Sequence, residues 1–401
     1  MPTTLGAPLE GRRIWLVGIG GAGLSGYALL ARSWGAEVGG WDRNETPYLH
    51  AVRDAGIEVR VSPEPELPVG WEVFVSSAYP DASGRPRADL LAELVAAAPS
   101  IVVAGAHGKT TTAAMIAFAL RETGRDPSWI VGGEVPQLGA NAGAGGGWLV
   151  VEGDESDRSV ASLQPQVAVL LNIDLDHHSE FGSRAEVQEL FDRWLTGVPE
   201  IVRGWELDPL EVELAVPGEH NRRNAAAAAA ALELVGVPRP EAVAALASFG
   251  GVGRRFELVG EAGAVEVFDD YAHNPEKLRA ALATARERTH ARGRVLALFQ
   301  PHLFSRTVHL ATELGRELAA ADVAAVTEIY PAREPAVPGV TGKLVVDALC
   351  DARPGAAPGW TPRLEDGARF LARRARAGDL VLTVGAGDID RAAPLILEAL
   401  S

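Results

Sequence analysis

The stretch IVVAGAHGKTTT, residues 101–112, decides the fold of the chain around it. Its first four residues are apolar and mostly β-branched, which predicts a buried strand, and an alanine-rich helical stretch follows Thr112. A glycine turn between a strand and a helix favours phosphate binding, because backbone N–H groups face the ligand. We expect Lys109 to hold the outer phosphates and the Thr110 hydroxyl to bind Mg²⁺. The spacing is shorter than the usual phosphate-loop motif, and the alternative is a plain glycine turn with a surface lysine.

The same strand, glycine turn and helix pattern recurs along the chain. It restarts near Pro99 and again after the glycines at 250, 251 and 253. Alternating β and α elements predict parallel sheets with helices on their faces. We therefore expect an α/β protein with three domains, at residues 1–98, 99–256 and 257–401. The outer two resemble Rossmann domains, and the central one resembles a phosphate-loop ATPase with a mostly parallel sheet.

Composition restricts the class of protein. The 401 residues carry a formal net charge of −16, which argues against nucleic acid as the main partner. The single cysteine, Cys350, excludes an internal disulfide framework, and we expect it to be a buried small apolar residue. The N-terminal residues lack the basic-then-apolar layout of a signal peptide, and no apolar run is long enough for a membrane helix, so we expect neither. We expect a cytoplasmic protein without a membrane partner, either a monomer or a homodimer.

A second glycine turn lies near the N-terminus. Gly18, Gly20 and Gly23 stand at the spacing of a diphosphate-binding turn, and Asp42 follows near the end of the next strand, where a ribose-binding acid belongs. This pattern does not distinguish NAD from a nucleotide sugar. One alternative is therefore an NAD-dependent dehydrogenase, although it leaves the turn at 105–110 unexplained.

Two acidic clusters follow the phosphate loop, each at a predicted strand end. One spans residues 152–157 and the other residues 172–178. Carboxylate oxygens suit Mg²⁺, which tolerates an occasional imidazole, so Glu152 and His177 are candidate metal ligands. The alternative is a pair of solvated acidic loops.

Further polar groups stand at helix starts, at the second domain boundary and at strand ends. His220, Asn221 and Asn224 precede the alanine-rich helix, where such residues are often only N-caps. Arg254 and Arg255 could bind a transferring phosphate or form an interdomain salt bridge. The segments 269–275 and 299–307 carry polar side chains that could hold a small charged substrate.

These motifs, in this order, resemble the Mur ligase family of bacterial cell-wall enzymes along nearly the whole chain. The resemblance rests on residues 17–26, 76–78, 105–112, 152–157, 172–177, 220–224, 254–256, 269–275, 299–307, 329–334 and 385–388. It implies a three-domain enzyme that uses ATP and Mg²⁺ to add L-alanine to the carboxylate of UDP-N-acetylmuramate through an acyl phosphate. Within the family the chain looks most like the branch that adds L-alanine.

The resemblance also implies roles for individual residues. The ATP site would comprise Gly105, Ala106, His107, Gly108, Lys109, Thr110, Thr111, His220, Asn221, Asn224 and Asp270. The UDP-sugar site would comprise Gly18, Gly20, Gly21, Gly23, Asp42, Ser76 and Ser77. The metal ligands would be Thr110, Glu152 and His177, and the amino-acid ligands His273 and Arg306. The catalytic residues would be Lys109, Arg254, Arg255 and His273, one of the two arginines contacting the γ-phosphate.

Three departures from the family pattern leave alternatives open. Leu303 and Asn274 stand where relatives often carry an arginine and a histidine, and the interval from His177 to His220 is short, so the central domain is expected to be reduced. The alternatives are a ligase for another amino acid or a recycled peptide, and a catalytically silent nucleotide-binding relative.

Overall fold

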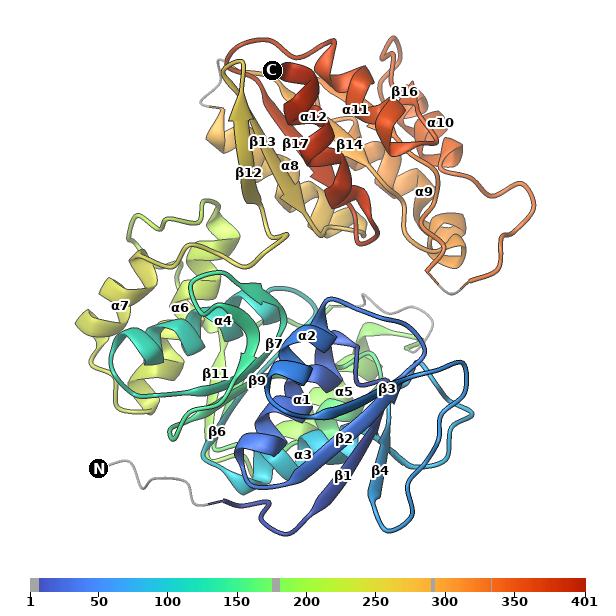
Figure 1. Cartoon of the computed structure of the whole chain (residues 1–401). Helices are drawn as coiled ribbons and strands as arrows, with labels where there is room; N and C mark the ends of the chain where they lie inside the picture. Colours follow the sequence, from blue (N-terminus) through green and yellow to red (C-terminus); the bar gives the residue numbers. More distant parts are fainter. Residues whose placement is uncertain (1–6, 175–180, 290–292, 333) are drawn as a thin grey trace. The chain divides into compact units, whose positions relative to one another are not determined.

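The computed structural model describes residues 7–174, 181–289, 293–332 and 334–401. The chain divides into two compact units, the first of residues 1–215 and 219–252, the second of residues 216–218 and 253–401. The strands of the described residues form three sheets, two in the first unit and one in the second (Figure 1). The domain boundaries expected at 98/99 and 256/257 stay predictions.

The first sheet is parallel throughout. Its strands are β1 (Arg13–Val17), β2 (Glu37–Asp42), β3 (Glu58–Val61), β4 (Glu72–Val75) and β5 (Arg85–Pro86), in the order β3-β2-β1-β4-β5. Alternate residues of β1 enter different cores: Ile14 and Leu16 pack with the helices, and Trp15 and Val17 pack with aromatic residues on the other face. The helices of this part are α1 (Ala22–Ser33), α2 (Tyr48–Asp54) and α3 (Arg87–Ala97).

The second sheet is parallel apart from one hairpin. Its strands are β6 (Ser100–Ala104), β7 (Ser128–Val135), β8 (Ala140–Gly143), β9 (Leu149–Glu152), β10 (Val167–Leu170) and β11 (Glu200–Arg203), in the order β11-β10-β6-β9-β7-β8. Only the pair β7–β8 is antiparallel among these. The accompanying helices are α4 (Lys109–Glu122), α5 (Arg184–Leu195), α6 (Glu219–Leu234) and α7 (Arg239–Ala247).

Helix α1 of the first sheet packs directly on the hairpin of the second. A Cβ added at Gly26 would lie 3.0 Å from side-chain carbons of both Ile130 and Ala142, so a larger residue would have to push these neighbours aside. The side-chain amide of Asn141 also donates to the carbonyl oxygen of Ala22 at 2.9 Å. Residues of the two sheets share one hydrophobic core, and the two glycine turns are therefore held within a single unit.

The alanine-rich helix α6 begins earlier than the sequence predicts. It starts at Glu219, directly after Gly218, whose φ of 103° is left-handed. Glu219 supplies an acidic first turn and pairs with Arg223 one turn later, which stabilises a start at this point. His220, Asn221 and Asn224 thus lie inside the first turns of the helix, and the expectation that they precede it is wrong.

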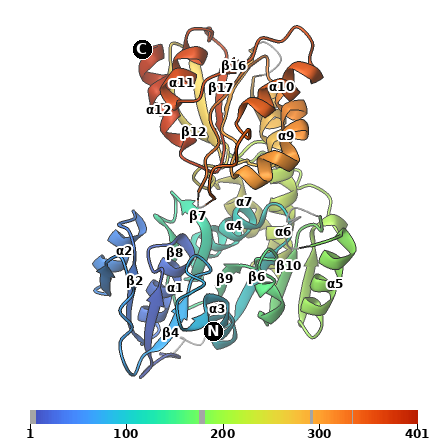
Figure 2. The ribbon, with the colours of Figure 1, turned by 90° about the vertical axis from the view of Figure 1, so that its right-hand side faces the viewer.

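The second unit holds a sheet covered by helices on both faces. Its strands are β12 (Glu257–Ala262), β13 (Val265–Asp270), β14 (Val295–Phe299), β15 (Val323–Val326), β16 (Gly359–Trp360) and β17 (Leu380–Val384), in the order β12-β13-β17-β14-β15-β16. Helices α8 (Pro275–Arg288), α9 (Phe304–Leu318) and α10 (Lys343–Ala352) pack on one face, and α11 (Leu364–Ala372) and α12 (Ala392–Leu400) on the other (Figure 2). Only β12–β13 is antiparallel, so the predicted α/β class with mostly parallel sheets is confirmed.

The side chain of Cys350, near the end of α10, is exposed. The expectation that it is a buried apolar residue is wrong. The helix buries Val345, Val346 and Leu349, and the next position along the chain turns away from that face.

Candidate active site

The turn between β6 and α4 has the backbone that a phosphate site requires. Gly105 and Gly108 have φ values of 131° and 86°. Asn172, just beyond β10, fixes His107 between them: its Oδ1 accepts from the His107 N–H and its Nδ2 donates to the His107 carbonyl, both at 2.9 Å. A Cβ at Gly108 would collide with Oδ1 of Asn224 on α6. The segment after β10 and helix α6 therefore both contact the turn. The turn is thus held open at the N-terminus of α4.

Lys109 is largely buried and ion-paired. Its Nζ lies 2.8 Å from Oε2 of Glu155 and 2.8 Å from the carbonyl oxygen of Gly105. The Lys109 side chain is 17% exposed and that of Glu155 only 2%. Lys109 is therefore not a freely exposed surface lysine, because its cation is held at the turn by this ion pair, and phosphate binding by the turn stays a prediction.

Glu152 and Thr110 form an oxygen-rich pair beside this lysine. The Thr110 hydroxyl donates to Oε2 of Glu152 at 3.0 Å, and the N–H of Gly132 on β7 donates to Oε1 of the same carboxylate. A hydroxyl and a carboxylate are the donor types that Mg²⁺ prefers, so this pair fits such an ion. Burial raises the pKa of the nearby Asp154 carboxyl, but the charge of Lys109 and hydrogen bonds from Ser156 act against it, and the net shift is downward.

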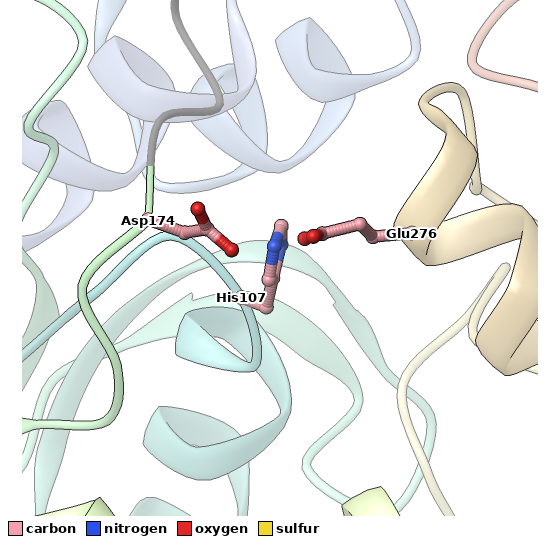
Figure 3. Close-up of side chains that lie close together, drawn as sticks. All are labelled: His107, Asp174 and Glu276. Carbon is pink, nitrogen blue, oxygen red and sulfur yellow. The ribbon is translucent and has the colours of Figure 1, made fainter. Parts of the chain in front are cut away.

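His177 lies outside the described residues, as do its neighbours from 175 to 180. Just before them, the side chain of Asp174 lies beside that of His107, with possible ligand atoms within 4.8 Å of each other (Figure 3). Glu276, also drawn there, belongs to α8 of the second unit. The described start of the acidic segment, residues 172–174, therefore lies against the phosphate loop, as the sequence predicts for adjacent strand ends.

A cavity of roughly 190 Å³ adjoins the Thr110–Glu152 pair. It opens between α1 and α3 on one side and β7 and β9 on the other, and it is lined by Gly23, Tyr27, Arg87, Ala88, Leu91, Lys109, Ile130, Val131, Gly132, Val151, Glu152, Asp154 and Ser159. The sequence analysis missed Tyr27 and Arg87. Burial raises the pKa of Tyr27 to about 12, so its hydroxyl stays protonated at neutral pH.

The first glycine turn is closed by Asp42. The buried carboxylate accepts from the Gly20 N–H at 2.8 Å through Oδ2, and from the Arg43 N–H and the Tyr79 hydroxyl through Oδ1, at 2.7 and 2.8 Å. Thr46 adds a hydrogen bond from its hydroxyl to the Gly20 carbonyl at 2.8 Å. The contact with a ribose stays a prediction, but the structure gives Asp42 a different task, which is to hold the turn.

The other predicted residues of this turn surround it. Gly18 has a φ of 91°, and a Cβ there would lie 2.8 Å from Cβ of Ser76. Ser76 is half-buried at the end of β4, whereas Ser77 and Gly21 are exposed and Gly23 is half-buried on α1. Tyr79, which the sequence analysis did not select, packs edge-on against Trp41.

The three predicted site residues on α6 differ in how deeply they are buried. Asn221 and Asn224 are buried, and Asn224 contacts the phosphate loop as described, whereas His220 is exposed. Ala106 is buried within the loop, and Thr111 is half-buried on the first turn of α4.

In the second unit, the adjacent arginines differ. Arg254 has a φ of 59°; it donates to Asp269 at 2.9 Å and to the carbonyl oxygens of Gly387 and Gly385 at 2.9 and 2.8 Å. Both arginines also lie against the Tyr271 ring, with the guanidinium carbons of Arg254 and Arg255 at 5.2 and 5.1 Å from its centre. Arg254 therefore braces a loop of its own domain, which leaves Arg255 as the better candidate for a phosphate ligand.

Asp270 lies next to these arginines at the end of β13. Its carboxylate accepts from the N–H groups of Phe256 and Ala272 at 2.9 and 2.8 Å. Burial raises the pKa of this carboxyl to about 6, although Arg255 and both N–H groups act in the opposite direction.

His273 and Arg306 meet through a third residue, His302. The His302 ring lies 6.1 Å from the His273 ring and 5.8 Å from the Tyr330 ring, on which it stacks. Nη1 of Arg306 lies 3.2 Å from Nδ1 of His302. Burial and the Arg306 charge lower the pKa of His302 to about 4, so the ring is neutral at pH 7 and accepts from the guanidinium. His302 and Tyr330 lie within the segments 299–307 and 329–334, but nothing in the sequence singles out either residue.

Comparison with known proteins gives a consistent result along the chain. The Mur ligase family catalytic domain matches residues 13–98, the Mur ligase middle domain residues 103–202, and the Mur ligase glutamate ligase domain residues 254–387. Among the described residues, no helix is both long and apolar enough to cross a membrane.

Several relatives are similar over their whole length. UDP-N-acetylmuramate–L-alanine ligase of Rubrobacter xylanophilus is 39% identical, covering 97% of this chain and 100% of the relative. The enzyme of the same name from Streptomyces coelicolor is also 39% identical, covering 99% of each chain. The crystal structure of UDP-N-acetylmuramate–alanine ligase from Thermotoga maritima superposes with a TM-score of 0.78 at 26% identity, covering 96% of this chain and 98% of that one.

The alignment with the Rubrobacter protein extends over 446 positions, more than the 401 residues of this chain, so that relative has residues with no counterpart here. Even so, three domain matches in the expected order and near full-length identity of 39% leave one assignment. The chain belongs to the Mur ligase family.

Proposed function

We propose that this protein is an ADP-forming ligase that joins L-alanine to the carboxylate of UDP-N-acetylmuramate in peptidoglycan precursor synthesis. The observation that carries the proposal is the 39% identity, over nearly the full chain, with enzymes named for that reaction. The phosphate-loop geometry is consistent with it, because Lys109, Thr110 and Glu152 gather charge and oxygen ligands at one helix N-terminus. The lactyl carboxylate takes the γ-phosphoryl group of ATP, and the amine of L-alanine then displaces phosphate from the acyl phosphate.

The first unit supplies the ATP end of the reaction. The N–H groups of residues 105–111 cradle the phosphates, and Lys109 neutralises the transferring group. Thr110, Glu152 and His177 hold Mg²⁺, which when bound spreads the negative charge of the phosphates. Asn221 and Asn224 face the adenine side, with His220 at the exposed rim. Because the lysine and the carboxylates are already positioned, little reorganisation is needed at the moment of transfer.

The first glycine turn holds the UDP portion. Gly18, Gly20, Gly21 and Gly23 allow the diphosphate to approach the backbone, and Ser76 and Ser77 lie at the neighbouring strand end. Asp42 keeps the turn in shape by its bond to Gly20.

The second unit binds the amino-acid substrate. Arg306 binds the L-alanine carboxylate as a planar fork, with His273 beside it. Arg255 contacts the γ-phosphate, Arg254 braces the loop at 385–387, and Asp270 contacts the ATP ribose. We place the domain boundaries at 98/99 and 256/257. Because its substrates are intracellular nucleotides, we also propose that the enzyme works in the cytoplasm as a monomer or homodimer.

The test is phosphate release by the purified protein. ATP, Mg²⁺ and UDP-N-acetylmuramate are supplied with L-alanine, glycine, L-serine or a cell-wall tripeptide, and the product mass is measured. We expect release to require both the nucleotide sugar and L-alanine, with some use of glycine or L-serine because Leu303 leaves the pocket less charged. Preference for the tripeptide would support a recycling ligase instead, and release without either acceptor, or none at all, would contradict the proposal.

A further inference from the structure

Arg87 reaches from the start of α3 into the cavity beside the phosphate loop. A Cβ added at Gly23 would lie 3.1 Å from its Nη1, so one side of the guanidinium faces the first turn of α1. Its Nη2 donates to Oδ2 of Asp157 at 3.2 Å. The Arg87 side chain is 27% exposed, which places it at the cavity wall rather than in bulk solvent.

Arg87 lies between the two proposed nucleotide sites. Gly23 closes the first glycine turn, and Lys109 and Glu152 line the same cavity as Arg87 from the phosphate-loop side. A substrate that is anchored at the first turn and reacts at the second must pass through this space. Residues of both sites line the cavity, and all of them belong to one compact unit. The cavity therefore connects the two sites.

A purely structural role explains the arginine poorly. The ion pair with Asp157 joins two partly exposed side chains, 27% and 34%, and such pairs contribute only about 0–1 kcal/mol. Burial lowers the pKa of Arg87, but Tyr27, Asp157 and Asp154 act against it and the net shift is upward, so the guanidinium at the cavity wall stays charged. A planar fork with donors directed at the cavity is the group that best binds a phosphate or carboxylate.

We propose that Arg87 binds the anionic part of the UDP-N-acetylmuramate, either the phosphate next to the sugar or the lactyl carboxylate. The inference rests on the proposed function, because that substrate alone carries both groups. Nη2 keeps its bond to Asp157 and orients the fork, while Nη1, on the Gly23 side, meets the substrate. Arg87 is thus a substrate-binding residue that the glycine motif does not reveal.

The experiment compares Arg87→Ala and Arg87→Lys with Arg85→Ala as a matched control. Arg85 is two residues away, 47% exposed and paired with Asp89 and Glu93. Binding of UDP-N-acetylmuramate, and of UDP-N-acetylglucosamine, which lacks the lactyl carboxylate, is measured by calorimetry alongside Tm. We expect Arg87→Ala to weaken UDP-N-acetylmuramate tenfold or more, Arg87→Lys less, and Arg85→Ala not at all, with the KM for ATP within about twofold.

The two sugars separate the two sources of charge. Weaker binding of both assigns Arg87 to the phosphate, and weaker binding of UDP-N-acetylmuramate alone assigns it to the carboxylate. Unchanged affinity in Arg87→Ala would overturn the proposal, as would a loss that Asp157→Asn reproduces together with a lower Tm. If the wild-type protein binds UDP-N-acetylmuramate but ligates nothing, the proposed function fails while this inference stands.

Discussion

The two glycine turns of the first unit occupy the same kind of position, between a strand and a helix, and differ in the side chains around them. Both follow a buried parallel strand and lead into a helix. At the first turn a carboxylate, Asp42, bonds to the Gly20 N–H. At the second turn a cation, Lys109, lies against the Gly105 carbonyl, with Glu155 and Glu152 behind it. In the proposed function the first turn holds an intact diphosphate, and the second adds the charges that a phosphoryl transfer needs.

The strongest test of this difference removes the cation. Lys109→Ala should lower phosphate release by about 100- to 1,000-fold, the usual cost of deleting one group that stabilises transition-state charge. Glu155 would be left buried without its lysine, so the double variant Lys109→Ala/Glu155→Gln separates lost activity from lost stability. Lys343→Ala, an exposed lysine paired with Asp347, is the control. Normal release by a folded Lys109→Ala would make the two turns equivalent and the comparison wrong.

The next test acts on the first turn alone. A Cβ at Gly20 would lie 2.9 Å from Oδ2 of Asp42 and 2.9 Å from Oγ1 of Thr46, so Gly20→Val should displace both supports. We expect the KM for UDP-N-acetylmuramate to rise at least about tenfold, equivalent to ~1.4 kcal/mol. Asp42→Ala should act in the same direction. A rise confined to the KM for ATP would mean that the two sites are assigned the wrong way round.

A third test extends the comparison to the second unit, where we propose that an arginine rather than a turn holds the substrate. Arg306→Lys loses the bidentate fork, and we expect the KM for L-alanine to rise by about tenfold. The KM for ATP should barely change. Arg316→Lys, exposed on the same helix, is the control. If L-alanine kinetics are unaffected in Arg306→Lys, the carboxylate is bound elsewhere.

The fourth test concerns the metal site that we propose at the second turn. Glu152→Ala should raise several-fold the Mg²⁺ concentration that gives half-maximal activity, because water replaces a carboxylate ligand only in part. Glu134, an exposed acid on β7, supplies the control variant Glu134→Ala. An unchanged Mg²⁺ titration in Glu152→Ala would remove this residue from the metal site.

The smallest effect is one of pH on stability. The folded protein holds the pKa of His302 at about 4, below the ordinary value of 6.5, so the unfolded chain binds the extra proton first as pH falls. The contribution of the neutral His302 ring to the free energy of unfolding is therefore present above pH 6.5 and is lost as pH falls towards 4. His302→Gln should show a shallower decrease of Tm over this range, whereas His309→Gln, exposed on α9, should keep the wild-type slope. Equal slopes in all three proteins would show that folding does not lower the pKa of His302.

Much of the fold could be predicted because strand, turn and helix are local patterns. The phosphate loop at 105–110 and the strand-end clusters follow from residues that are adjacent in sequence. The contacts that complete the sites are not local: Lys109 pairs with Glu155, Asp42 with Tyr79, and Arg87 with Asp157. Nothing in the sequence spacing indicates these pairs, because the order of strands in the sheet decides which loops meet. The early start of α6 depends on the Gly218 backbone and the Glu219–Arg223 pair, which the alanine run conceals.

The close packing of Gly26 against Ile130 and Ala142 has a consequence for which substrates can react. Because α1 packs against the β7–β8 hairpin, the distance between the two glycine turns is fixed within the first unit. It does not adjust to the length of the substrate. The arm that links the sugar to its reacting carboxylate must then have one length. Analogues whose acid side arm is a methylene longer or shorter than lactyl should bind through their UDP end and yet fail to receive phosphate.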